Sequence, residues 1–335
     1  MGRPKVYITS RSFGRRCTEA LEMVKAVADV EVNPYGRTMH KAELLEAVKD
    51  VDGLIVGNDK IDRNIIENAP KLKIVARHGV SVSNVDLEAA TDRGIIVTYT
   101  PSANADAVAD FTVGLMISVA RYIPQAHAST VQGRWDTRGF IGAEVNGKTL
   151  GIVGLGTIGT LVARRVKGFN MRVLYYSRTR KPHLERELGV EYVDLETLLR
   201  ESDFVTIHVD LTEETRGMIG EKELSMMKRT AYLINTARGP VVDEDALYKA
   251  LKERRIAGAA VDVYSREPPG ADFPLFKLDN FVATPHIAAY TEEAIRRMDL
   301  MNAEDLVRFF SGKKPEHIAN IEVLEKLKER GVSLE

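Results

Sequence analysis

Residues 148–180 read KTLGIVGLGTIGTLVARRVKGFNMRVLYYSRTR, and this stretch decides the fold. An apolar run at residues 149–153 leads into the glycine-rich segment GLGTIG at residues 154–159. An amphipathic stretch and a second apolar run, at residues 171–176, follow. This order predicts a strand, a tight glycine turn, a helix and a second strand.

Each of the three glycines meets one requirement of a dinucleotide-binding turn. Gly154 permits the sharp turn out of the strand, Gly156 lets the backbone approach a pyrophosphate, and Gly159 lets the helix pack closely on the sheet. The phosphates would then lie on the free N–H groups where the helix begins, at Thr157 and Ile158. A glycine pattern alone is weak, but the two flanking strands favour a dinucleotide site over a purely structural turn.

The end of the second strand indicates which dinucleotide binds. An acidic residue at this place usually holds the ribose 2′-OH of NAD, whereas a nearby arginine suits the 2′-phosphate of NADP. Here the segment is Ser177-Arg178-Thr179-Arg180 and contains no acid. We therefore predict a preference for NADP(H). The alternative is NAD(H), with both arginines solvated.

Composition excludes several classes of protein. The 335 residues are 44% hydrophobic and 28% charged with a net charge of -1, which is typical of a globular chain of about two domains. The near-neutral balance argues against nucleic acid or a membrane surface as the main partner. No apolar run approaches the roughly 18 residues of a membrane span.

The cysteine content, the start of the chain and the spacing of the histidines indicate the cellular compartment and whether a metal site is expected. Cys17 is the single cysteine and cannot form an intramolecular disulfide, so we expect a cytoplasmic protein. The start of the chain leads directly into a strand, which does not resemble a signal peptide. The histidines show no metal-ligand spacing, and we expect no metal site.

The first hundred residues alternate between apolar runs and amphipathic segments, which predicts a parallel sheet covered by helices. The expected strands cover residues 6–9, 30–32, 53–56, 73–76 and 95–98. The expected helices cover residues 15–27, 41–48, 63–68 and 86–91. We interpret this region as a complete small α/β domain.

A boundary follows at residues 100–102, where Pro101 stops extended pairing and Ser102 offers a helix cap. A long helix is expected over residues 104–121, ended by Pro124, with a further helical piece at residues 126–132. Beyond the glycine turn, helices are expected at 195–200, 221–228 and 243–254, and strands at 204–209, 231–235, 258–263 and 281–283.

The last long helix, expected at residues 291–311, has no strand of its own, and we expect it to return to the first domain. We therefore predict a Rossmann dinucleotide-binding domain, residues 102–289, inserted into a flavodoxin-like parallel α/β domain. That second, discontinuous domain comprises residues 1–101 and 290–335 and would bind the substrate.

Three charged or titratable residues follow predicted strands of the nucleotide domain. Arg238 follows AYLINTA, Glu267 lies shortly after the strand that ends at residue 263, and His286 follows FVATP. Because the carboxyl ends of parallel strands share one edge of the sheet, these residues are expected on one rim.

These three side chains suit the reduction of a 2-oxo acid. Hydride transfer to a carbonyl carbon requires a proton at the oxygen, and histidine titrates nearest to working pH. The carboxylate of Glu267 would favour and orient the imidazolium of His286. The guanidinium of Arg238 would hold the substrate carboxylate in a bidentate manner and polarise the carbonyl.

The motifs GLGTIG, INTARGPVVDEDAL, AAVDVYSREPP and TPHIAAYTEEA together resemble the D-isomer-specific 2-hydroxyacid dehydrogenases, over essentially the whole chain. The resemblance implies Arg238 as the substrate clamp, Glu267 as the partner of the acid/base and His286 as the acid/base. It also implies that Asp262 contacts the nicotinamide carboxamide. Further residues would line the cofactor, namely His208, Thr236, Ala237 and Ala288.

The loop over residues 77–86 reads RHGVSVSNVD, and in this family it binds the substrate carboxylate through backbone N–H groups. The residues carried over are Arg77, Gly79, Val80 and Ser81. The loop resembles that of phosphoglycerate dehydrogenases, in which an arginine at the position of Arg77 lies near the substrate phosphate. Ser81 stands for a usual glycine, Ser83 for a usual aspartate and Asp210 for a usual proline.

A phosphoglycerate dehydrogenase-like activity is therefore our first expectation. The strand end VLYYSRTRK instead resembles NADPH-dependent glyoxylate and hydroxypyruvate reductases, which are the alternative. A nucleotide-sensing binding protein related to co-repressors is a third interpretation. We expect a homodimer whose domains close over the cofactor and a small 2-oxo or 2-hydroxy acid, with Trp135 in the arm that packs across the two-fold axis in relatives.

Overall fold

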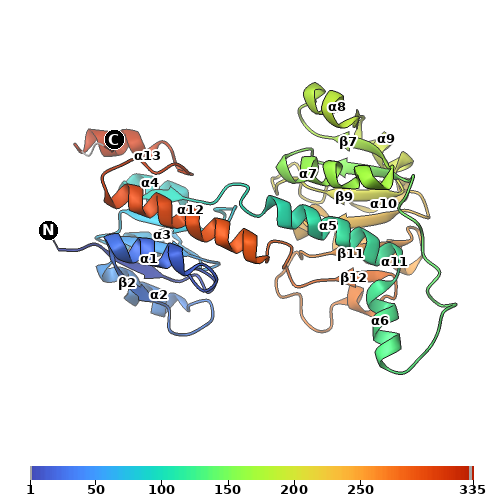
Figure 1. Ribbon diagram of the computed structural model, residues 1–335, viewed down its shortest axis with the longest axis horizontal. Helices are drawn as coiled ribbons and strands as arrows, with labels where there is room; N and C mark the ends of the chain where they lie inside the picture. Colours follow the sequence, from blue (N-terminus) through green and yellow to red (C-terminus); the bar gives the residue numbers. More distant parts are fainter. Residues whose placement is uncertain (1, 332–333) are drawn as a thin grey trace. The chain divides into compact units, whose positions relative to one another are not determined.

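The computed structural model describes residues 2–331 and 334–335, and the chain divides into two compact units. The first unit comprises Met1–Asn104 together with Tyr290–Glu335, and the second comprises Ala105–Ala289. Each unit is built around its own parallel sheet, with helices on both faces (Figure 1).

The first unit contains a five-stranded sheet in the order β2-β1-β3-β4-β5, all strands parallel. Its strands are β1 Lys5–Ile8, β2 Asp29–Val32, β3 Gly53–Val56, β4 Ile74–Arg77 and β5 Ile96–Thr98. Its helices are α1 Thr18–Val27, α2 Lys41–Ala47, α3 Arg63–Glu67, α4 Leu87–Arg93, α12 Glu292–Phe310 and α13 Val323–Glu329. The strand order is that of flavodoxin-like sheets, in which the winding reverses between β1 and β3.

Alternation along β1 shows how this sheet separates two cores. Val6 and Ile8 face the core beneath α1 and α12, which lie side by side, whereas Tyr7 faces the core beneath α2, α3 and α4 (Figure 1). Successive side chains of a strand point to opposite faces, so both faces of a sheet covered by helices must be apolar. Burial of all four residues of β3 follows from this arrangement.

The second unit contains a seven-stranded parallel sheet in the order β12-β11-β10-β9-β6-β7-β8. Its strands are β6 Thr149–Val153, β7 Arg172–Tyr176, β8 Glu191–Tyr192, β9 Phe204–Ile207, β10 Tyr232–Asn235, β11 Gly258–Val261 and β12 Phe281–Ala283. Its helices are α5 Ala105–Ala120, α6 Ile123–Val131, α7 Thr157–Arg165, α8 Pro182–Leu188, α9 Leu195–Glu201, α10 Glu221–Met226 and α11 Glu244–Lys252.

This second sheet has the doubly wound order of Rossmann domains, and its winding reverses between β6 and β9. Helices α5 and α7 lie side by side on one face, and α9, α10 and α11 contribute to the core on the other (Figure 1). Val162 and Ala163 on α7 are buried against the sheet. The amphipathic pattern that follows the glycine turn therefore marks the face that packs.

The connection after α5 differs from its sequence-based description. Pro124 does not end the long helix, because α5 already ends at Ala120 and Pro124 lies in the first turn of α6. The break occurs at Tyr122, whose φ of 54° lies in the left-handed region. Proline is well tolerated in the first turn of a helix, where its missing N–H would have no partner.

Ser102 also differs from its expected role. It has a φ of 58°, and α5 begins only at Ala105, so Ser102 is not the residue that caps this helix. Among the described residues, no single helix is long and apolar enough to cross a membrane. The pair α5 and α6, bent by 64°, meets that test on length and composition alone.

Candidate active site

The turn between β6 and α7 forms a cradle whose glycines meet different surroundings. A Cβ on Gly154 would lie 2.6 Å from the carbonyl oxygen of His208, and one on Gly159 would lie 2.2 Å from the carbonyl oxygen of Gly154. A Cβ on Gly156 would meet nothing within 4 Å. Protein packing therefore requires two of the glycines, while the third borders open space. Gly156 is also the N-cap of α7 and provides no side-chain cap for its first N–H groups.

The segment after β7 contains two arginines, of which only one has a hydrogen-bond partner among the described residues. Arg180 is held by Glu185 through two contacts of 2.8 Å, and this hydrogen bonding lowers the pKa of Glu185 to about 2. Arg178 is exposed and makes no ion pair or hydrogen bond with the residues that the structure describes. The Ser177 hydroxyl donates to the carbonyl oxygen of Thr179 at 2.8 Å, which closes the turn.

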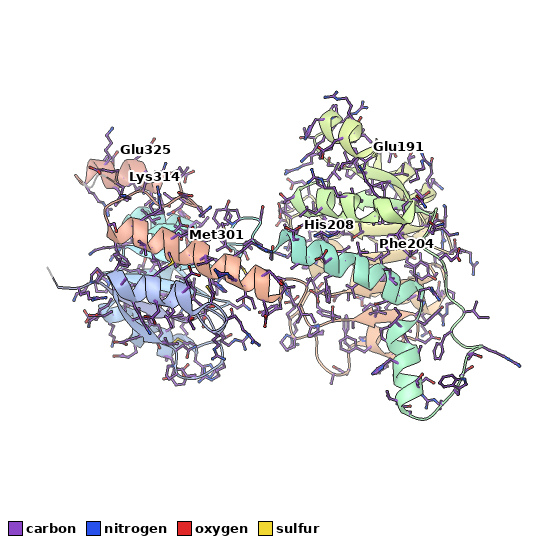
Figure 2. The ribbon with its side chains drawn as sticks, in the orientation of Figure 1. Glu191, Phe204, His208, Met301, Lys314 and Glu325 are labelled. Carbon is purple, nitrogen blue, oxygen red and sulfur yellow. The ribbon has the colours of Figure 1, made fainter. Side chains whose placement is uncertain are left out.

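His208 follows β9 and is labelled in Figure 2. Its Nε2 lies 3.0 Å from the Thr206 hydroxyl, while its Nδ1 is buried and has no hydrogen-bond partner among the described residues. Burial lowers the pKa of His208 to about 3. The ring is therefore neutral at working pH, and its buried Nδ1 stays without a partner among the described residues.

The turn after β10 is held by a residue that the sequence analysis did not select. Asn235 is buried; its Oδ1 accepts the N–H of Ala237 at 3.0 Å and its Nδ2 donates to the carbonyl oxygen of Arg238 at 3.0 Å. The Thr236 hydroxyl lies 2.8 Å from that of Thr112 on α5. A polar residue that ends an otherwise apolar strand was the available signal for Asn235.

Asp262, which follows β11, anchors the loop after β12. Its side chain is fully buried; Oδ1 accepts the N–H of Ile287 at 2.9 Å and Oδ2 accepts the N–H of Ala288 at 2.8 Å. The hydroxyl of Thr284 also donates to Oδ1, at 2.5 Å. These bonds surround His286, whose φ of 56° is unusual for a residue other than glycine. Asp262 therefore fixes the backbone that carries the predicted acid/base, a role that the sequence analysis did not predict.

His286 and Glu267 form a direct pair. Nδ1 of His286 lies 2.6 Å from Oε2 of Glu267, and Oε1 of Glu267 accepts the N–H of Tyr264 at 3.0 Å. Burial acts to raise the pKa of Glu267, but the hydrogen bonds from His286 and Tyr264 and the nearby charge of Arg238 outweigh it and lower this pKa. Glu267 is therefore ionised at working pH and available to balance a protonated imidazole.

The side chain of His286 is 47% exposed, so its second nitrogen, Nε2, is accessible to solvent and to a ligand. Arg238 is half-buried and donates from one guanidinium nitrogen to the carbonyl oxygen of Ala237 at 2.7 Å. A carboxylate, an imidazole and a guanidinium thus follow β11, β12 and β10 of the same sheet. This set can deliver a proton to an oxygen and bind an anion.

The loop after β4 belongs to the first unit. Asn84 organises it, because its Oδ1 accepts from Nε of Arg77 at 2.9 Å and its Nδ2 donates to the carbonyl oxygens of Gly57 and Asp59. Arg77 also donates to the carbonyl oxygen of His78. The guanidinium of Arg77 is thereby tied to its own loop.

Some backbone N–H groups in this loop have an acceptor among the described residues and others do not. The N–H of Gly79 donates to the carbonyl oxygen of Arg77 at 2.9 Å. Among the described residues, the N–H groups of Val80 and Ser81 have no acceptor. The hydroxyl of Ser81 lies 3.2 Å from that of Ser83. Two adjacent N–H groups without an acceptor are available to an anion, as in the backbone turns that bind carboxylates.

Comparison with known proteins shows which protein family this chain belongs to. The model of the NAD-binding domain of D-isomer specific 2-hydroxyacid dehydrogenases matches residues 113–288. The glyoxylate reductase of Korarchaeum cryptofilum is 50% identical over 327 residues, which are 96% of this chain and 97% of the relative. The chain belongs to the D-isomer-specific 2-hydroxyacid dehydrogenase family.

A second relative in the family carries another name. The D-3-phosphoglycerate dehydrogenase of Methanocaldococcus jannaschii is 44% identical over 305 residues, covering 90% of this chain and 57% of the relative. Among solved structures, the TT0316 protein of Thermus thermophilus matches with a TM-score of 0.87 and 38% identity, over 94% of this chain and 99% of that one.

Membership of the dehydrogenase family confirms the predicted fold class, the oxidoreductase activity on CH–OH groups and the use of a nicotinamide dinucleotide. The cradle fits such a cofactor: the space before Gly156 is open, the first N–H groups of α7 lack a side-chain cap, and Nδ1 of His208 has no partner among the described residues. The residues that the dehydrogenase motifs single out follow β6, β7, β9, β10, β11 and β12, all at the carboxyl edge of one sheet.

Proposed function

We propose that this dehydrogenase is a reductase of small, unphosphorylated 2-oxo acids, glyoxylate and hydroxypyruvate, and that it uses NADPH. The choice of substrate rests on the hydrogen bonds that the guanidinium of Arg77 makes. Its guanidinium is tied to Asn84 and to the carbonyl oxygen of His78, as expected of a group that shapes the loop. A phosphorylated substrate would need that charge for itself. The naming of similar relatives as glyoxylate reductases supports the same choice.

Each catalytic residue has a role that its contacts support. A bound nicotinamide dinucleotide supplies the hydride. His286 would give a proton from Nε2 to the carbonyl oxygen, because its Nδ1 is held by Glu267 at 2.6 Å. Glu267 would stabilise the protonated ring and keep its orientation. Arg238 would bind the carboxylate and polarise the carbonyl, and the N–H groups of Val80 and Ser81 would bind a carboxylate as well.

Steady-state kinetics test the substrate. Glyoxylate, hydroxypyruvate and 3-phosphohydroxypyruvate are compared, each with NADPH and with NADH, for the wild type and Arg77→Ala. We expect a higher kcat/KM for the two unphosphorylated acids, and an effect of Arg77→Ala that is similar on all three. A preference for the phosphorylated acid that Arg77→Ala abolishes would overturn the proposal in favour of a phosphoglycerate dehydrogenase.

The cofactor preference rests on Arg178, with the hydroxyls of Ser177 and Thr179 beside it. Arg178 is the guanidinium after β7 that Glu185 does not hold, so we assign the 2′-phosphate to it. Arg178→Ala should lower kcat/KM for NADPH about tenfold and leave that for NADH within twofold. Arg180→Ala is the matched control, since it removes an arginine of the same loop that already has a partner. An equal effect of both variants would contradict the assignment.

We also propose a homodimer. A groove of about 670 Å³ within the second unit is lined mostly by apolar side chains of α5, α6 and β12, including Phe111, Leu115 and Phe281. In the same unit, the segment after α6 exposes Trp135 and Ile141, which are 85% and 81% accessible. Exposed apolar surface on this scale is typical of an interface. Sedimentation equilibrium should give twice the chain mass of 37.2 kDa, and a monomer at micromolar concentration would contradict it.

A further inference from the structure

A buried imidazole–carboxylate pair lies directly beside the loop that we assign to the substrate carboxylate. Nε2 of His78, the residue after β4, is 2.7 Å from Oδ1 of Asp299 on α12, and their side chains are 3% and 0% exposed. Nδ1 of His78 faces the hydroxyls of Ser10 and Ser12, at 3.2 and 3.3 Å. Neither His78 nor Asp299 has a part in the chemistry proposed so far.

Helix α12, on which Figure 2 labels Met301, connects this pair to two loops. Oδ2 of Asp299 accepts the N–H of Gly14, in the loop after β1, at 3.0 Å. One turn later, Nδ2 of Asn302 donates to the carbonyl oxygen of Arg77 at 3.3 Å. Asp299 and Asn302 are both fully buried. One helix thus holds the loops that follow β1 and β4, at the carboxyl edge of the first sheet.

The backbone around His78 makes its side chain an anchor for the loop. The N–H of Gly79 bonds the carbonyl oxygen of Arg77, so His78 is the central residue of a three-residue turn. The carbonyl oxygen of Gly79 accepts the N–H of Thr100 at 3.0 Å. The N–H groups of Val80 and Ser81 come next in the chain. A rotation at His78 would change where these donors point.

Stability alone does not account for such a pair. Removing two polar partners from water is expensive, and apolar side chains of similar volume usually stabilise a core as well or better. What the pair adds is a fixed position, because two buried polar groups 2.7 Å apart must stay together once both have left water. The neighbouring turn needs a fixed position if its N–H groups are to meet a carboxylate.

We propose that His78 and Asp299 are positioning residues, which fix the turn before Val80 and Ser81 so that these N–H groups bind the substrate carboxylate. The proposal rests on the proposed function of the loop. Asp299 acts through His78 and Gly14, and Asn302 supports the same turn at the carbonyl oxygen of Arg77. Neither side chain of the pair touches the reacting atoms.

The same helix provides a matched control. Asp305, further along α12, is 1% exposed in its side chain and lies 3.1 Å from Nδ1 of His317. It also accepts the N–H of Glu316 at 2.7 Å. This pair also joins an imidazole to a buried carboxylate of α12, with the His317 side chain 23% exposed, but it holds the segment at residues 316–317. A purely structural effect should therefore appear in both pairs, whereas an effect on substrate binding should appear in one.

The test compares Asp299→Asn with Asp305→Asn by steady-state kinetics, by the inhibition constant of oxalate, an unreactive dicarboxylate, and by thermal unfolding. Asp299→Asn should raise KM for glyoxylate and the oxalate constant by about tenfold, with KM for NADPH within twofold. Asp305→Asn should leave all three within twofold, although both variants should unfold at a lower temperature. Equal kinetic effects of the two variants, or unchanged substrate and oxalate constants in Asp299→Asn, would overturn the inference.

A second variant keeps the test decisive if Asp299→Asn fails to fold. His78→Gln retains a donor for Asp299 in place of Nε2 but not the rigid ring, and it should raise KM for glyoxylate less than His78→Ala does. An equal rise in both variants would also overturn the inference. If the wild type itself reduces no 2-oxo acid, the proposed function fails and not the positioning role, since binding of oxalate to the wild type and to Asp299→Asn can still be compared by calorimetry.

Discussion

Two of the imidazole–carboxylate pairs among the described residues have nearly equal lengths but opposite surroundings. His286 and Glu267 are 2.6 Å apart with side chains 47% and 38% exposed, whereas His78 and Asp299 are 2.7 Å apart with side chains 3% and 0% exposed. A histidine must exchange a proton with solvent or substrate to act as an acid or base. The exposed pair therefore suits chemistry, and the buried pair suits geometry. Contact distance alone does not separate the two roles, but exposure does.

The largest expected difference concerns turnover. His286→Ala should lower kcat for glyoxylate by about 10²- to 10⁴-fold, because it removes the proton donor for the carbonyl oxygen. His78→Ala should act mainly on KM for the oxo acid. Steady-state kinetics with saturating NADPH, and fluorescence titration of NADPH as a control for cofactor binding, check this. An unchanged kcat in His286→Ala would contradict the proposed role of His286 as the acid/base.

The free energy of unfolding should depend more on the buried pair, His78 and Asp299, than on the exposed pair, His286 and Glu267. Asp299→Asn should lower the free energy of unfolding by about 3 kcal/mol, since it disturbs a buried pair. Glu267→Gln should lower it by less than about 1 kcal/mol, because partly exposed pairs are screened by solvent. Urea unfolding at pH 7 measures both. Similar losses in the two variants would show that exposure does not govern these pairs.

His208 extends the comparison to a half-buried histidine whose Nδ1 is buried and which has no carboxylate beside it among the described residues. Burial lowers its pKa from the ordinary 6.5 to about 3, so the unfolded chain takes up a proton first as pH falls. The neutral ring costs nothing above pH 6.5, and stability is lost progressively from there down to about pH 3. The loss should be about 2 kcal/mol at pH 5. Urea unfolding at pH 7 and pH 5 should show this loss in the wild type and a smaller one in His208→Gln.

The smallest expected effect is the loss of the Glu267 contribution to stability at low pH. The pKa of Glu267 is lowered in the folded chain, so its contribution to stability is complete above the ordinary value of 4.5 and is lost as pH falls through the lower folded value. The small deficit of Glu267→Gln at pH 7 should therefore vanish in more acidic solution. A deficit that stays constant down to about pH 3 would mean that the loss comes from packing and not from charge.

Several parts of the molecule could be predicted from sequence because each is encoded over a short stretch. The segment GLGTIG between two apolar runs predicts the turn from β6 to α7, and the close approaches at Gly154 and Gly159 agree with it. Alternating apolar and amphipathic stretches predict both parallel sheets. The break at Tyr122 and the short strand β8 were not predicted, since a left-handed residue and a two-residue edge strand carry no periodic signal.

The sequence by itself determined the family, the two parallel sheets and the candidate residues Arg238, Glu267 and His286, because short motifs place them after strands. Only the tertiary structure decided which groups hold the loops. Asp262 reaches the backbone beside His286, and Asp299 reaches both Gly14 and His78, across long separations in the chain. Such contacts depend on how strands and helices pack, and hydrogen bonds between distant residues leave no pattern in the order of amino acids.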